Sequence, residues 1–115
     1  MATTYVLNFS FKDSLSDSEA LAELSFLMEE VVPAIAKVNG VRGVKVFSGA
    51  GALRAHLTAT IEMEDAGVYE RLLMDATVRR LLGRTYGAWD LKNSSQAFYR
   101  EITPELIKAL SSTGS

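Results

Sequence analysis

Hydrophobic and polar residues alternate strictly over the stretch from Leu53 to Met63. Apolar residues occupy every second position, and the positions between them are Arg54, His56, Thr58, Thr60 and Glu62. An alternation of period two predicts a β-strand with one packed face and one face in a polar environment. Three further strands are expected, at about Thr4 to Phe11, Val41 to Ser48 and Gln96 to Ile102.

A capping box marks the start of the first predicted helix. Ser16 is the expected N-cap, and Glu19 is the residue whose carboxylate reaches back to it. Apolar residues then recur at steps of three and four as far as about Lys37, which is the period of an amphipathic helix. Because Pro33 lacks a backbone N–H, we expect it to kink this helix or to divide it near Val31.

A second helix is expected to begin at the acidic pair Glu64 and Asp65, where negative charge favours the helix dipole. Asp75 is expected to interrupt it and to cap a further helical segment that runs through Leu82. Gly83 and Gly87 bracket the expected end of that segment.

A short C-terminal helix is predicted after Thr103, with this threonine as N-cap and Pro104 at the first helical position. Residues 111–115 are expected to form a flexible tail. The 115 residues fit one domain, with a core over residues 4–110.

The order of these elements is β-α-β-β-α-β, with the turn signal Gly49-Ala50-Gly51 between the two middle strands. This order predicts an α+β, ferredoxin-like fold: a four-stranded antiparallel sheet with two helices on one face, plus the short C-terminal helix. The other sheet face would carry Val6 and Phe47 beside polar groups. Such a face is costly to expose and too polar for a simple core, so a second copy of the chain is expected to cover it.

Composition and charge exclude several classes of function. The chain has no cysteine, which excludes disulfides, thiolate catalysis and zinc–cysteine sites. The net charge is -2, and the uncovered face of the third strand carries no aromatic residue, so no nucleic-acid partner is expected. Neither a signal peptide nor a membrane-spanning stretch is recognisable, so no membrane partner and a cytoplasmic location are expected.

Three stretches carry a resemblance to a known superfamily: Val38 to Val44, Tyr69 to Arg79, and Tyr86 to Trp89. Over roughly residues 4–102 the chain resembles the dimeric α/β-barrel superfamily. This superfamily includes domains similar to antibiotic-biosynthesis monooxygenases, stress-responsive barrel proteins and muconolactone isomerases. The resemblance points to no subfamily. It implies a homodimer in which two sheets meet face to face and close a barrel, with ligand pockets between sheet and helices or inside the barrel.

His56, the only histidine, is the first candidate catalytic residue, because imidazole can act as acid, base or ligand near neutral pH. Asn8 is expected on the same sheet face, where it could position a substrate or donate to an oxyanion. The alternative is that His56 only forms hydrogen bonds across a polar dimer interface.

Four residues are candidate ligand contacts: Arg54, Phe47, Tyr86 and Trp89. Tyr86 and Trp89 belong to an aromatic group, with Tyr69 and Tyr99, that could line a pocket for a planar organic ligand. Plain core packing is the alternative, and it is favoured for Tyr69. One histidine without cysteines cannot complete a metal site, so neither a metal nor another cofactor is expected.

Two functions remain open. The chain is either a small-molecule-binding homodimer with cofactor-independent monooxygenase or isomerase activity on a small aromatic or ring compound, or a non-catalytic dimeric binding or stress-associated protein. In the second case the polar sheet face is an interface filled by side chains such as Phe47, Thr58 and Thr60.

Overall fold

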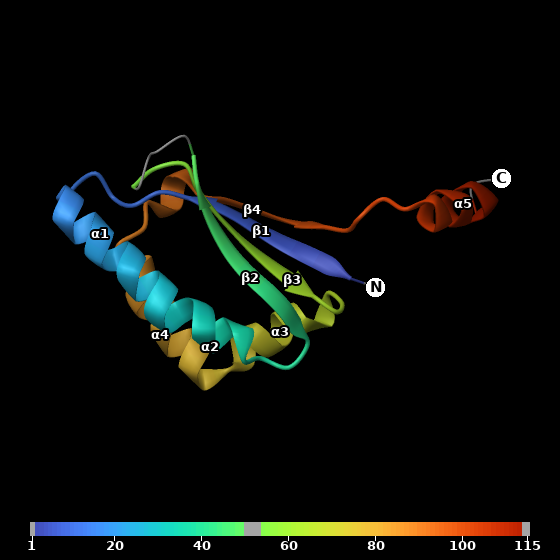
Figure 1. Cartoon of the computed structure of the whole chain (residues 1–115), viewed down its shortest axis with the longest axis horizontal. Coiled ribbons are helices and arrows are strands. Elements are labelled where there is room, and N and C mark those ends of the chain that lie inside the picture. Colours follow the sequence, from blue (N-terminus) through green and yellow to red (C-terminus); the bar gives the residue numbers. More distant parts are fainter. Residues whose placement is uncertain (1, 50–53, 114–115) are drawn as a thin grey trace.

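The computed structural model describes residues 2–49 and 54–113. Its sheet and two-part helical layer are drawn in Figure 1, and the element bounds are β1 (Thr3–Phe9), α1 (Asp17–Phe26), η1 (Leu27–Val31), α2 (Val32–Ala36), β2 (Val41–Ser48), β3 (Leu57–Met63), α3 (Gly67–Met74), α4 (Ala76–Tyr86), η2 (Leu91–Asn93), β4 (Ser95–Tyr99) and α5 (Pro104–Thr113). The predicted β-α-β-β-α-β order is confirmed. In the turn expected at Gly49-Ala50-Gly51, Ala50 and Gly51 lie outside the described residues.

The four strands form one antiparallel sheet in the order β2-β3-β1-β4. Val6 on β1 lies opposite Thr60 on β3 and Ala97 on β4, and Phe47 on β2 lies opposite Thr58. All the helices from α1 to α4 lie on the other side of the sheet in Figure 1. The α+β, ferredoxin-like arrangement is therefore confirmed, and one sheet face is left without a helix.

The first helix is divided at the position expected from its proline. The capping box is present: the Ser16 hydroxyl accepts from the Glu19 backbone N–H at 3.1 Å, and the Glu19 carboxylate accepts from the Ser16 N–H at 2.9 Å. The helix then widens into the π-helical segment η1, where the Val32 N–H donates to the carbonyl of Leu27, five residues back. Because Pro33 cannot donate a backbone hydrogen bond, a shift of hydrogen-bonding register just before it fits this sequence.

The second helix is interrupted at Asp75, as expected. The Asp75 carboxylate accepts from the backbone N–H of Val78 at 2.9 Å and so caps α4. The helix α4 continues past Leu82 and Gly83 to Tyr86, and Gly87 is its C-cap, so it ends at the second of the two glycines expected to bracket its end. Buried residues on both sides of Gly83, namely Leu81 and Thr85, hold this turn in place, and their packing outweighs the weak helix propensity of glycine.

Two predicted strand ends are also wrong. β3 begins at Leu57 rather than Leu53, so Arg54 and His56 precede the strand instead of belonging to its polar face. The cause lies at His56, whose φ of 57° belongs to the left-handed region and breaks the extended backbone. β4 ends at Tyr99 rather than Ile102.

The C-terminal helix α5 begins as predicted, with the Thr103 hydroxyl accepting from the Leu106 N–H at 3.1 Å. Figure 1 shows α5 standing apart from the sheet and its helices, beyond the end of β4. It extends through residues 111–113 of the expected tail, and residues 114–115 lie outside the described range. Within the described ranges, no helix is long and apolar enough to cross a membrane.

Gly40 holds the connection from α2 to β2 close to α3. Its φ is 96°, and a Cβ built on it would lie 2.5 Å from Val68 Cγ2, closer than real Cβ contacts come. Val68 is fully buried, so it cannot move aside. Only glycine satisfies both the left-handed backbone and the close approach at this position.

Two glycine-to-alanine variants should therefore have opposite effects on the free energy of unfolding. Gly40→Ala should lower it by about 2 kcal/mol through backbone strain and the clash with Val68. Gly83→Ala should raise it by up to about 1 kcal/mol, since nothing lies within 4 Å of that Cβ and alanine favours the helix. Urea unfolding of both proteins checks this, and a stable Gly40→Ala protein would contradict the packing described.

Candidate functional site

A largely apolar cavity of about 70 Å³, partly open to solvent, lies between the sheet and the helices. β1, β2 and β3 supply one wall, through residues such as Leu7, Val44 and Ile61, and the helices supply the other. No charged side chain is among its described lining residues. The position between the two layers agrees with one of the two pocket locations implied by the resemblance.

The π-helical segment forms part of the cavity wall. Leu27 and Val31, at the two ends of η1, are both buried and both line the cavity, and Ile35 follows them on α2. A π-turn holds one residue more than an α-turn, and such turns occur often at functional sites. Here it brings side chains four residues apart onto the cavity side of the helix.

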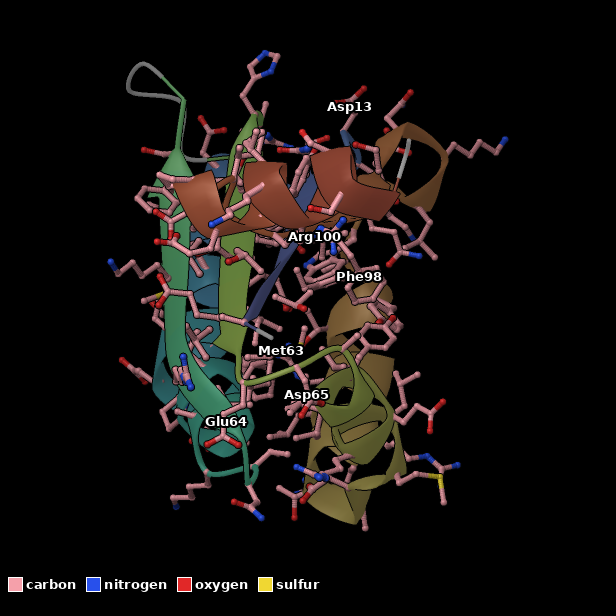
Figure 2. The ribbon with its side chains drawn as sticks, turned by 90° about the vertical axis from the view of Figure 1, so that its right-hand side faces the viewer. Asp13, Met63, Glu64, Asp65, Phe98 and Arg100 are labelled. Atoms are coloured by element: carbon pink, nitrogen blue, oxygen red, sulfur yellow. The ribbon has the colours of Figure 1, made fainter. Side chains whose placement is uncertain are left out.

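Aromatic rings crowd one end of the cavity. The Tyr5 ring centroid lies 5.1 Å from that of Tyr69 and 5.2 Å from that of Phe98, and the Tyr69 and Phe98 centroids are 4.9 Å apart. Figure 2 shows Phe98 on the side of the sheet that faces α3 and α4. Three chain segments that are far apart in sequence therefore meet in one cluster.

Two phenol groups at the cavity keep their protons more firmly than a free tyrosine does. Burial raises the pKa of Tyr5 well above its ordinary value, and the neighbouring Tyr69 raises it further. Burial also raises the pKa of Tyr86, with a smaller contribution from Tyr69. The Tyr5 hydroxyl donates a short hydrogen bond to the Gln96 side-chain oxygen. Both phenols are thus neutral hydrogen-bonding groups at neutral pH.

Trp89 belongs to the cavity wall and carries an unsatisfied donor. Its ring stacks on Phe9 at 4.5 Å between centroids, and the Tyr86 ring meets it edge-on at 5.3 Å. The residue is only 3% exposed, and its indole Nε1 finds no acceptor within the described part of the chain. A buried N–H without a partner carries a free-energy cost. Because Nε1 has almost no accessible surface, it does not border the open space of the cavity.

The predicted catalytic pair lies elsewhere. Asn8 and His56 line one surface hollow of about 370 Å³ on the uncovered side of the sheet, so the expectation that they lie near each other is met. The Asn8 side-chain oxygen accepts from the Thr58 hydroxyl at 2.7 Å. Neither Asn8 nor His56 lines the cavity that holds Tyr86 and Trp89. The predicted site residues therefore divide between the two faces of the sheet.

Arg54 does not project from the sheet as expected. Its guanidinium donates to the Asp17 carboxylate at 2.8 Å and to the carbonyls of Lys12 and Leu15 at 3.0 and 2.6 Å. These three bonds tie the segment before β3 to the loop that precedes α1. The expected ligand contact through Arg54 is thus replaced by a structural role.

Phe47 lies on the uncovered face of β2, as expected, and is 51% exposed. Tyr99 also belongs to this face, because it lies opposite Thr4. The structure therefore separates Tyr99 from the aromatic group with which the sequence placed it, while Tyr69, Tyr86 and Trp89 line the cavity together.

No protein-family model matches the sequence, and no curated protein is significantly similar to it. Solved structures do match. A dimeric protein of unknown function with a ferredoxin-like fold from Bacteroides fragilis has a TM-score of 0.73 at 12% identity, over 87% of this chain and 96% of its own. The chain has the ferredoxin-like fold.

Two further ferredoxin-like neighbours carry a named activity. SnoaB, a cofactor-independent oxygenase from Streptomyces nogalater, has a TM-score of 0.70 at 13% identity over 90% of this chain and 97% of its own. A protein described as an antibiotic biosynthesis monooxygenase has a TM-score of 0.70 at 11% identity, over 90% of this chain and 100% of its own. These matches confirm the predicted resemblance at the level of the fold and assign no subfamily.

Sequence reasoning missed two residues of this site. Tyr5 was placed only on the apolar face of its strand, and Gln96 was assigned no role, yet the Tyr5 hydroxyl donates to Gln96 beside the cavity. Core packing was favoured for Tyr69, which lines the cavity next to Tyr5. A signal for Tyr5 was present, since a tyrosine hydroxyl on an otherwise apolar strand face needs a polar partner. Among the described residues, no group of three or more histidine and acidic side chains could hold a metal ion.

The raised pKa of Tyr5 predicts a loss of stability at alkaline pH. Above the ordinary tyrosine pKa near 10, the unfolded chain releases the Tyr5 proton while the folded chain keeps it, so the free energy of unfolding falls as pH rises. Between about pH 9 and pH 11, Tyr5→Phe should therefore lose less stability than the unsubstituted protein.

Tyr99→Phe is the matched control, because this ring is 58% exposed and lies on the other face of the sheet. Unfolding in urea at several pH values gives, for each protein, the slope of the free energy of unfolding against pH. Equal slopes for Tyr5→Phe and the unsubstituted protein would contradict the burial of the phenol.

Proposed function

We propose that this protein is a homodimer that binds a small, flat, uncharged aromatic compound in the cavity between sheet and helices. The observation that carries the proposal is the apolar cavity itself, whose wall includes Tyr5, Tyr69, Tyr86 and Trp89 and, among the described lining residues, no charged side chain. An apolar space with a few polar groups is the usual form of a small-molecule site.

The size of the cavity limits its occupant. About 15 Å³ of such volume holds one water, so 70 Å³ corresponds to about five waters, or roughly one six-membered ring. A charged ring would lose its hydration without gaining a counter-ion from the described lining, which disfavours anions and cations. The chemistry therefore favours a neutral ring.

The uncovered sheet face supports the dimer. It presents Val6, Phe47 and Tyr99 beside Asn8, Thr58 and Thr60. Exposed apolar side chains grouped in this way on one face are typical of an interface between proteins. The ferredoxin-like neighbour from Bacteroides fragilis is described as dimeric. A second copy placed on this face would also cover the hollow that holds His56 and Asn8.

Cofactor-independent monooxygenation is the activity we propose for the bound ring. An electron-rich dihydroxyarene can supply all the electrons itself: one atom of O2 enters the ring as a carbonyl oxygen, and the other leaves as water with two substrate hydrogens. Hydroquinone plus O2 gives hydroxybenzoquinone plus water without another reductant. Support comes from the apolar cavity, which excludes water, and from the neighbour SnoaB, a cofactor-independent oxygenase.

Binding without catalysis is the second candidate, and one observation favours it. Proton abstraction from a phenol needs a base, and the ionisable groups of the described cavity lining are tyrosines, two of which have raised pKa values. His56 could serve as a base with Asn8 as positioning donor only for a ligand that reaches the uncovered face. Isomerisation of a small ring compound would also need a base beside the ligand.

A substitution that introduces a charge on the uncovered face tests whether this face forms the dimer interface. Light scattering should give the mass of two 12.5-kDa chains, and Val6→Asp at the centre of this face should give the mass of one. A buried carboxylate pair across the two-fold axis costs several kcal/mol. Leu21→Asp on the outer surface of α1 is the control and should remain dimeric. A monomeric unsubstituted protein would refute this part of the proposal.

Hydroquinone binding tests the cavity. Trp89 is the only tryptophan, so its fluorescence reports the site directly. Val44→Phe fills the cavity from β2 and should weaken hydroquinone binding at least about tenfold, a loss of about 1.4 kcal/mol. Val41→Phe is the control, because it adds the same ring to the same strand outside the cavity lining. Equal binding by the two variants would place the ligand elsewhere.

Oxygen uptake with hydroquinone, in buffer containing a chelator and no flavin, separates the two candidates. Uptake above the protein-free rate that Val44→Phe abolishes supports monooxygenation, whereas binding without uptake supports the non-catalytic function. His56→Ala should leave hydroquinone binding unchanged within about twofold, because His56 lies outside the cavity lining. Loss of uptake with intact binding in this variant would identify His56 as the base.

A further inference from the structure

A second hollow adjoins the cavity along the edge strand β4. Its volume is about 250 Å³, and Tyr5, Leu7, Tyr86 and Trp89 line both spaces. The cavity is apolar, whereas the hollow is somewhat more open and adds polar residues at the start of β4. These four shared residues therefore lie between the ring-sized cavity and the larger, more polar hollow.

We infer that this hollow is a subsite for a neutral, hydroxyl-bearing substituent on the ring that the cavity holds. The inference rests on the proposed function and deepens it. The cavity admits roughly one ring, while small-molecule sites usually span about 300 Å³ or more. Cavity and hollow together reach the lower end of that range, so a ligand of ordinary size occupies both.

The polar groups of the hollow fit hydroxyl groups rather than charges. The Gln96 side-chain oxygen is occupied by the Tyr5 hydroxyl, which leaves its amide N–H groups as donors for a ligand. Ser94 donates to the Leu91 carbonyl at 2.9 Å, which leaves its oxygen as an acceptor. No charged side chain occurs in the described lining of the hollow. Neutral donors beside neutral acceptors suit a polyhydroxylated group such as a sugar.

The shared wall is suited to the junction between ring and substituent. Trp89 and Tyr86 line both spaces, so a linking oxygen between ring and substituent would lie against their aromatic rings. Tyr86 is 42% exposed, and a tyrosine hydroxyl can both donate and accept a hydrogen bond. Phenyl glycosides have this shape: one ring, one linking oxygen and a neutral hydroxylated end.

Three probes with the same ring test the subsite, with Trp89 fluorescence as the readout. Phenyl β-glucoside should bind at least about tenfold tighter than phenol, because it adds contacts in the hollow. Benzoate should bind more weakly than phenol, since neither space offers a counter-ion within the described lining. Tighter binding of benzoate than of phenol would overturn the neutral character of the site.

Ser94→Ala tests the hollow apart from the cavity, because Ser94 lines only the hollow. This variant removes one hydrogen-bond acceptor, so it should reduce the affinity for phenyl β-glucoside about fivefold and change that for phenol less than twofold. Lys92→Leu, an exposed position in η2 outside both linings, is the control and should change neither.

The outcomes distinguish this inference from the proposed function. Equal affinities for phenol and phenyl β-glucoside, or loss of both in Ser94→Ala, would overturn the subsite and leave the cavity as the binding site. No response of Trp89 to any of the three probes would overturn the cavity proposal as well.

Discussion

The packing of all the sheet-covering helices against one face of the sheet is the constraint on which the rest of this structure depends. Two helical units, divided before Pro33 and at Asp75, lie on one side of the sheet, so β1, β2 and β3 each have one apolar and one mixed face. The covered face borders a cavity of about 70 Å³. The uncovered face is the proposed dimer interface. The ligand binding and the self-association proposed above would therefore involve opposite faces of the same strands.

This separation gives the ionisable groups different environments. The phenols of Tyr5 and Tyr86 are on the covered side, where burial raises their pKa values and keeps them neutral. His56 and Asn8 lie on the uncovered side, beside an open hollow. Proton transfer and aromatic recognition therefore do not share one cavity within a single chain. A catalytic cycle that used both would require the ligand, or a second copy of the chain, to connect them.

Much of the fold could be predicted from the sequence because the signals are local. The alternation in β3, the capping box at Ser16 and the caps at Asp75 and Thr103 each depend on residues within one turn or one strand. The site was predicted less well because its geometry is tertiary. Arg54 is turned away by an ion pair with Asp17, 37 residues earlier, and the Tyr5–Gln96 hydrogen bond spans 91 residues. No pattern within one element encodes either contact.

The π-helical segment has a consequence for how this chain can change in evolution. Each residue of an α-helix turns the chain by about 100°, so removing one residue from Leu27–Val31 would rotate α2 by that amount about its axis. Ile35 would leave the core, and Pro33 would again face the α-helical register that it disfavours. The segment should therefore accept exchanges of one aliphatic residue for another, whereas a single-codon deletion there would remove the wall of the cavity. Among homologues, we expect length to be kept at this helix more strictly than the identity of its residues.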